Sequence, residues 1–126
     1  MKVNKAYGDF IGQLPWNIFA TLRSPYRINT MTPRRWFKKL MTTSNKVLSV
    51  FYSVEKDKGD QKSLHVHTLI NSSTDISYEE FRSDLGGVAV GDYDLIKDPK
   101  EVASYVTKYF GVYDADYDLL FKEDRT

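Results

Sequence analysis

The chain has 126 residues, of which 41% are hydrophobic and 14% aromatic, and this length suits one compact domain with a single core. The formal net charge is only +1, so an anionic partner has to be met by a local basic patch rather than by the overall charge. The absence of cysteine excludes disulfides and thiolate metal sites and fits a reducing, cytoplasmic compartment. No apolar run approaches the roughly 20 residues of a membrane span, and the N-terminus does not lead into a signal peptide. We therefore expect one cytoplasmic domain over residues 1–126.

The first half of the chain predicts a strand, a helix and a β-hairpin. A β-branched and aromatic run at residues 16–23 fits a strand. A Thr-Pro pair and apolar residues at helical spacing then predict a helix over about residues 33–44. Residues 46–55 form a second strand-like run, and a turn signal at residues 58–61 leads into another at residues 63–70. We expect these two strands to pair antiparallel.

The second half predicts a helix, a strand and a final helix. Residues 75–82 fit a short capped helix that two glycines end, and residues 88–96 fit a strand. Asp98 and a following proline open the last helix, which runs over about residues 99–110. The order β-α-β-β-α-β-α predicts an α+β fold, in which a central antiparallel sheet carries helices on one face in a ferredoxin-like arrangement.

The only two histidines, His65 and His67, lie two residues apart in the strand-like run at residues 63–70. Alternate residues of a strand point to the same face, so both imidazoles are expected to project together. Two ordinary hydrogen-bonded histidines would give the same pattern. If the hairpin turn centres on Asp60, Glu55 lies directly opposite His65 and adds a carboxylate, with Asp57 and Asp60 as reserve candidates. Two imidazoles and a carboxylate predict a site for Mg²⁺ or Mn²⁺ with positions open to substrate.

The last predicted helix carries Tyr105, Lys108 and Tyr109. At about 100° per residue, Tyr109 lies at the edge of the apolar stripe, which suits packing as well as chemistry, and Tyr105 lies farther round. Tyr105 is flanked by Lys108 and Tyr109 on the helix surface. A tyrosine beside a lysine is a candidate nucleophile, because the ammonium group can stabilise the phenolate or a phosphate charge.

Three segments resemble the motifs of HUH-superfamily endonucleases, specifically the replication initiators (Rep proteins) of rolling-circle plasmids and viruses. The sequence Phe-Ala-Thr-Leu-Arg at residues 19–23 resembles the first motif, His65-Val-His67 the second, and Tyr-Val-Thr-Lys at residues 105–108 the third. Their order and spacing cover most of the chain. The fold that this resemblance implies is the ferredoxin-like, RRM-like palm of the HUH nucleases.

The resemblance implies that His65, His67 and an acidic residue bind Mg²⁺ or Mn²⁺. It also implies that Tyr105 attacks DNA, leaving a 5′-phosphotyrosine link and a free 3′-OH, with Lys108 as its helper. Tyr109 makes the third motif Y-x-x-K-Y, which is similar to two-tyrosine initiators as well as to one-tyrosine Reps; we favour Tyr105 as the essential nucleophile. The helicase domain of many viral Reps is absent, so the chain is a small stand-alone Rep or one domain of a larger one.

Binding of single-stranded DNA is expected to depend on local charge. Residues 23–46 contain seven basic residues and no acid, whereas residues 114–126 form an acidic tail. The candidate phosphate contacts are Arg23, Arg27, Arg34, Arg35, Lys38 and Lys39. The expected partner is a replication origin, in the form of a stem-loop, with host or viral replication proteins as further candidates and the oligomeric state open.

Two alternatives share part of this pattern. A transposase or relaxase of the same superfamily would also carry paired histidines and a tyrosine helix. A non-catalytic ferredoxin-like module that binds nucleic acid would need exposed aromatic rings on its sheet and would need neither the histidines nor Tyr105.

Overall fold

The computed structural model describes residues 11, 13–24, 31–56, 64–86, 88–98, 100–102 and 116–122. At residues 24, 31, 55, 56, 64, 116 and 117 it describes the backbone alone. The elements in chain order are β1 (Ile18–Ser24), α2 (Met31–Thr43), β2 (Val47–Lys56), β3 (Leu64–Ser72), α3 (Tyr78–Leu85), β4 (Ala89–Leu95) and β5 (Asp116–Phe121). A further helical turn covers residues 100–102.

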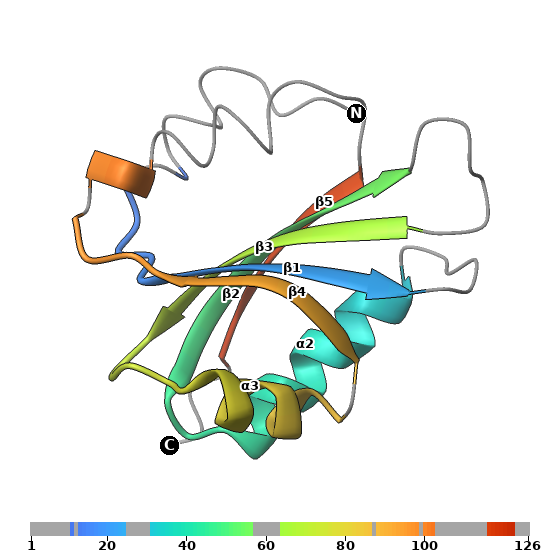
Figure 1. Cartoon of the computed structure of the whole chain (residues 1–126), viewed down its shortest axis with the longest axis horizontal. Coiled ribbons are helices and arrows are strands. Elements are labelled where there is room, and N and C mark those ends of the chain that lie inside the picture. Colours follow the sequence, from blue (N-terminus) through green and yellow to red (C-terminus); the bar gives the residue numbers. More distant parts are fainter. Residues whose placement is uncertain are drawn as a thin grey trace.

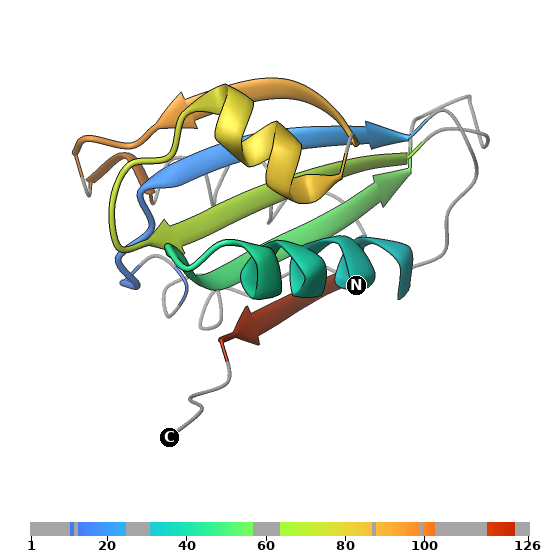
Figure 2. The ribbon, with the colours of Figure 1, turned by 90° about the horizontal axis from the view of Figure 1, so that it is seen from below.

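The strands form one antiparallel sheet in the order β4-β1-β3-β2-β5, so β3 is the central strand (Figure 1). Both β1 and β2 run antiparallel to β3, and they are therefore parallel to each other with β3 between them. Likewise β3 and β4 are both antiparallel to β1 and flank it. The helices α2 and α3 lie side by side on one face of this sheet (Figure 2). The predicted α+β class with an antiparallel sheet is confirmed.

The helix α3 shows why its boundaries could be predicted. The Ser77 hydroxyl accepts a hydrogen bond from the Glu80 amide at 3.1 Å, which caps the first turn. At the other end, Gly86 adopts a φ of 83°, and its amide donates to the carbonyls of Arg82 and Ser83. A side chain is strained at that φ, so glycine suits the C-cap.

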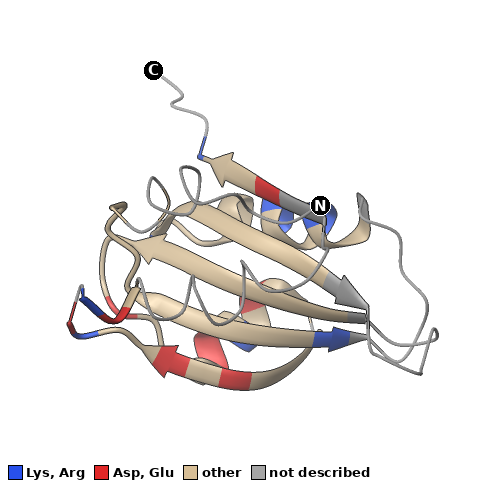
Figure 3. Cartoon of the chain, turned by 90° about the horizontal axis from the view of Figure 1, so that it is seen from above, with Lys and Arg blue, Asp and Glu red and all other residues tan. Residues whose placement is uncertain are grey.

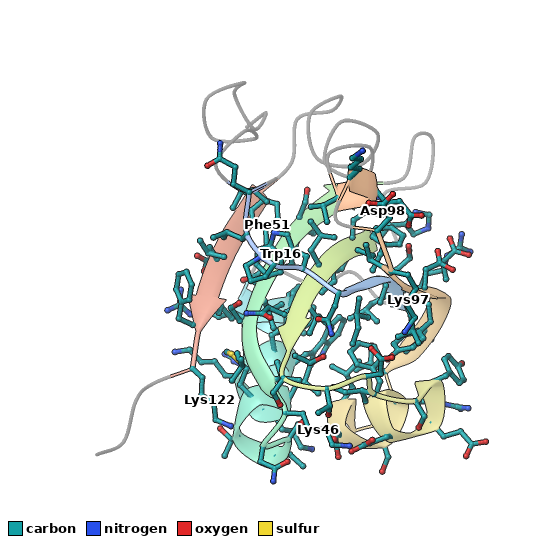
Figure 4. All side chains as sticks on the ribbon, turned by 90° about the vertical axis from the view of Figure 1, so that its left-hand side faces the viewer. Trp16, Lys46, Phe51, Lys97, Asp98 and Lys122 are labelled. Carbon is teal, nitrogen blue, oxygen red and sulfur yellow. The ribbon has the colours of Figure 1, made fainter. Side chains whose placement is uncertain are left out.

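Each face of the sheet carries its own apolar cluster. The helix face is the larger one, and on it α2 and α3 cover the even-numbered residues of β1 and of the middle of β3, among them Ile18, Leu22, Val66 and Ile70. On the opposite face the odd-numbered strand residues Phe19, Phe51 and Leu69 form a smaller cluster, which also contains Ile11, Trp16, Ile96 and Val102. Figure 4 shows Trp16 and Phe51 on the side of the sheet away from the helices, and Lys46 on the helix side.

Two features differ from the sequence-based expectation. The helical turn at residues 100–102 does not join α2 and α3, because Val102 packs into the cluster on the opposite face. The strand β5 was not predicted, since its acidic residues suggested a tail. Leu119 packs with the smaller cluster and Leu120 with the larger one, so this edge strand contributes to both faces. None of the helices in the described part of the chain has the length and apolarity that a membrane crossing requires.

Tyr52 gives the fold a testable dependence on alkaline pH. Burial raises the pKa of Tyr52 to about 12 from its usual 10.0, and the Asp118 carboxylate adds to this, while Arg34 acts in the opposite direction. The tyrosine therefore stabilises the folded chain fully below pH 10, and this contribution is lost as the pH rises toward 12. We expect the urea midpoint to fall over this window, and to fall less in a Tyr52→Phe variant. Equal slopes in the two proteins would contradict the assignment; Tyr93, whose pKa burial also raises to about 12, remains in both.

Candidate active site

His65 and His67 project from the central strand onto the sheet face that α2 and α3 leave free. Val66, between them, is fully buried in the larger cluster on the helix side, and Leu69 belongs to the smaller cluster on the other side. Because side chains alternate along a strand, His65 and His67 lie on the same face as Leu69. The prediction that the two imidazoles share a face is confirmed.

Residues on this face form three rows that cross the sheet. Each row consists of residues that are paired across neighbouring strands. The first row is apolar and consists of Phe19, Leu69, Phe51 and Leu119. The second is polar and consists of Thr21, His67 and Ser53, with Tyr117 at the next register position. The third is charged or titratable and consists of Arg23, His65 and Glu55. Polarity therefore increases along the strands, from the buried apolar row toward the hairpin end of the sheet.

His67 is the inner of the two histidines. Its side chain is 7% exposed, and its ring lies nearly parallel to that of Phe19, with 6.5 Å between centroids and 12° between planes. Thr21 and Ser53, which flank it on β1 and β2, are also buried. His65, one row farther out, is half-buried. The His67 ring is thus enclosed by buried neighbours, whereas His65 is partly accessible to solvent.

The hairpin register places Glu55 directly opposite His65, which confirms the predicted pairing of these two positions. Directly opposed residues of an antiparallel pair have Cβ atoms about 4.5–5.5 Å apart. Among the side chains that the structure describes, which do not include that of Glu55, no three potential ligands are grouped closely enough to hold a metal. The reserve candidates Asp57 and Asp60 lie outside the described residues.

The donor chemistry at these positions fits a divalent cation. Two imidazoles on one strand face supply nitrogen ligands, and the position opposite the outer one carries a carboxylate. Imidazole and carboxylate ligands with further positions open to water or substrate are typical of catalytic rather than closed structural sites. His65, His67 and Glu55 are therefore the residues that would hold the ion.

The candidate nucleophile lies in a segment that the structure does not describe, since Tyr105, Lys108 and Tyr109 fall within residues 103–115. The helical turn at residues 100–102, which comes before this segment, is described. The Asp98 carboxylate accepts a hydrogen bond from the Lys100 amide at 3.0 Å, and the Asp98 carbonyl accepts one from the Glu101 amide at 2.9 Å. The predicted helix start at Asp98 is thus confirmed (Figure 4).

Val102, at the end of that helical turn, is 1% exposed and packs into the cluster that contains Phe19, Phe51 and Leu69. Those three residues form the row next to His67.

The basic residues expected to bind phosphate are divided between the two faces. Arg23 is exposed and occupies the row of His65 and Glu55 on the histidine face, which Figure 3 shows from above. The other described candidates, Arg34, Arg35, Lys38 and Lys39, lie on α2, which covers the opposite face. Arg34 also donates to the Asp118 carboxylate at 2.9 Å and so ties α2 to β5. Arg27 lies outside the described residues.

The residues that surround His67 were not predicted from the sequence. Phe19 was noted only as part of a motif, and neither Thr21 nor Ser53 was singled out. The strand register places Thr21 and Ser53 beside His67. This could be predicted only if the pairing of β1 and β2 with β3 were known. Comparison with known proteins finds no family model, no curated protein and no solved structure that matches the chain.

Proposed function

We propose that the chain is the nicking domain of an HUH-type endonuclease, which cuts and rejoins single-stranded DNA through a covalent tyrosine intermediate at a rolling-circle replication origin. One observation carries the proposal: Val102, three residues before Tyr105, packs onto the sheet face that bears both histidines. The two histidines and Val102 come from distant parts of the sequence, and they share this face.

The finer fold class belongs to the same proposal. The elements β1-α2-β2-β3-α3-β4 contain two split β-α-β units, in which β3 lies between β1 and β2, and β1 lies between β3 and β4. This strand order supports a ferredoxin-like fold, to which β5 would add an edge strand. It leaves one sheet face free for the palm site of a nuclease.

In the proposed reaction the Tyr105 hydroxyl gives up its proton, and its oxygen attacks the phosphorus of the scissile phosphodiester. The bond from phosphorus to the 3′ oxygen breaks, that oxygen takes up a proton as a free 3′-OH, and a 5′-phosphotyrosine remains. Rejoining reverses these steps, because a 3′-OH attacks the phosphotyrosine and releases the phenol. Lys108 stabilises the negative charge, and His65, His67 and Glu55 would hold a divalent ion. When bound, a divalent ion would polarise the phosphoryl oxygens and align the scissile bond.

The non-catalytic nucleic-acid-binding module is the alternative from a different functional class. It would stack bases on exposed aromatic rings of the sheet. Among the described residues of the histidine face, Trp16, Phe19 and Phe51 are buried, and the exposed ring belongs to Phe121 near the end of the edge strand. Tyr52 is buried on the helix side, where its ring packs against that of Phe37. This surface therefore favours the enzyme over the module.

A strand-transfer assay tests the proposal. The chain is incubated with a panel of labelled single-stranded oligonucleotides, including stem-loops, in Mn²⁺, Mg²⁺ or EDTA. We expect metal-dependent cleavage that leaves a free 3′-OH, and joining of that end to a second oligonucleotide. Binding of the panel without cleavage in either metal would instead support the non-catalytic module. Joining restricted to transposon-end or transfer-origin hairpins would favour a transposase or relaxase.

A further inference from the structure

We propose that Arg23 forms a phosphodiester-binding subsite beside the candidate metal ligands, where it holds the DNA backbone over His65 during strand cleavage. This inference rests on the proposed function and deepens it, because it assigns one side chain to substrate binding and identifies the end of the sheet at which the DNA lies. The inference thus selects one site from the six basic residues that the sequence suggested as phosphate contacts.

The register of the sheet fixes the location of Arg23. Phe19 belongs to the cluster on the histidine face, and residues 21 and 23 follow it at the two-residue spacing of a strand. Arg23 pairs with His65 in the ladder between β1 and β3, just as Glu55 pairs with His65 from the other side. Directly opposed Cα atoms in such ladders lie about 5 Å apart, so the arginine is an immediate neighbour of the outer histidine.

The charge of Arg23 is available for a ligand. Its side chain is exposed and makes no hydrogen bond or ion pair with the described side chains. By contrast, Arg34 is paired with Asp118 and Lys46 with Glu80, each at about 3 Å. Those cations stabilise contacts between elements of the fold, whereas Arg23 has no such structural role in the described part of the chain.

The surroundings of Arg23 favour an anion with the geometry of a phosphate. It is the one arginine or lysine among the described strand residues of the histidine face, while Asp92 and Asp94 are exposed along the β4 edge. A phosphate backbone is therefore repelled from that edge and attracted to Arg23. A guanidinium also presents a planar pair of donors that matches two phosphate oxygens, which an ammonium group cannot do.

The test compares Arg23→Gln with Arg82→Gln, which removes the same charge from an exposed position of α3 on the opposite face. Affinity for a fluorescent single-stranded oligonucleotide is measured by anisotropy over a range of salt concentrations in EDTA. The rate of adduct formation is measured in Mn²⁺, and Mn²⁺ binding alone is followed by calorimetry. Arg23→Lys separates the geometry of the guanidinium from its charge.

We expect Arg23→Gln to flatten the plot of log affinity against log salt by about 0.7, as loss of one phosphate contact requires. Adduct formation should slow by about 10- to 100-fold, with Mn²⁺ binding unchanged. Arg23→Lys should restore the salt dependence and only part of the rate, and Arg82→Gln should leave both near the wild-type values.

The outcomes separate this inference from the proposed function. Equal salt slopes for Arg23→Gln and the wild type would overturn the subsite while leaving the nuclease proposal intact. A reduced slope without any adduct from the wild type would support a phosphate site and contradict the nuclease. Loss of Mn²⁺ binding in Arg23→Gln would show that the arginine supports the metal ligands instead of the DNA, and would also overturn the subsite.

Discussion

A chain in which both His65 and His67 are replaced by alanine is expected to lose metal-dependent cleavage, by about a thousand-fold or more. The two imidazoles are the nitrogen donors of the proposed site, and Glu55 alone would not hold the ion in place. A bound ion supplies several kcal/mol of charge stabilisation to phosphoryl transfer, and about 4 kcal/mol corresponds to this factor. Cleavage is measured as release of a labelled fragment, and Mn²⁺ binding is measured separately by calorimetry.

The matched control for this variant is Asn71→Ala, which removes a half-buried polar side chain from the same face of the same strand. Because His67 is buried against Phe19, its removal also costs some stability, and urea denaturation is needed to confirm that the double variant is folded under the assay conditions. The single variant His65→Ala, at a half-buried position, provides a second test in a less perturbed fold. Undiminished cleavage by a folded double variant would exclude the histidines as metal ligands.

Tyr105→Phe is expected to eliminate the covalent protein–DNA adduct, since the ring is retained and only the nucleophilic oxygen is lost. Tyr109→Phe is expected to retain most adduct formation. On an ideal helix Tyr109 lies about 40° nearer the apolar stripe than Tyr105, and is thus better placed for packing. A shifted band on a denaturing gel, after incubation with single-stranded DNA and Mn²⁺, measures both variants.

The two tyrosines are four residues apart, so both can face the same site if they lie on one helix. A two-tyrosine mechanism would give each single variant about half of the adduct and would lose all of it only in the double variant. An adduct that survives in Tyr105→Phe and disappears in Tyr109→Phe would reverse the assignment.

Local patterns were sufficient to predict most of the elements and one critical pairing. The caps at Ser77 and Asp98 are formed by side chains that bond to amides two or three residues away, so they depend on nearby sequence alone. The register that places Glu55 opposite His65 follows from the position of a single turn. The pairing of β1 with both β3 and β4 joins segments far apart in the chain, and no local pattern determined it.

The arrangement of the layers was harder to predict for the same reason. Helical spacing in α2 indicates that Phe37 and Leu40 are buried and that Arg35 and Lys38 are exposed, but it does not indicate which face of the sheet the helix covers. The α2 cations were therefore grouped with Arg23 as phosphate contacts, although the sheet separates them.

The strand β5 was missed because an edge strand has a weak pattern. Its two leucines are adjacent and face opposite sides of the sheet, so they do not alternate with polar residues. Asp118, which suggested a solvated tail, is instead paired with Arg34 of α2. Pairing across 84 residues of sequence cannot be recognised from the composition of either segment.

The most direct test of the central claim is to identify the residue that becomes linked to DNA. The wild-type chain is incubated with an intact oligonucleotide that it is able to cleave, in Mn²⁺ and in EDTA. The products are digested with a protease and a nuclease and examined by peptide mass spectrometry. We predict a nucleotide attached through phosphate to Tyr105 in the Mn²⁺ sample and no modified peptide in EDTA. A modification on a residue other than Tyr105, or cleavage with no modified peptide at all, would contradict the account.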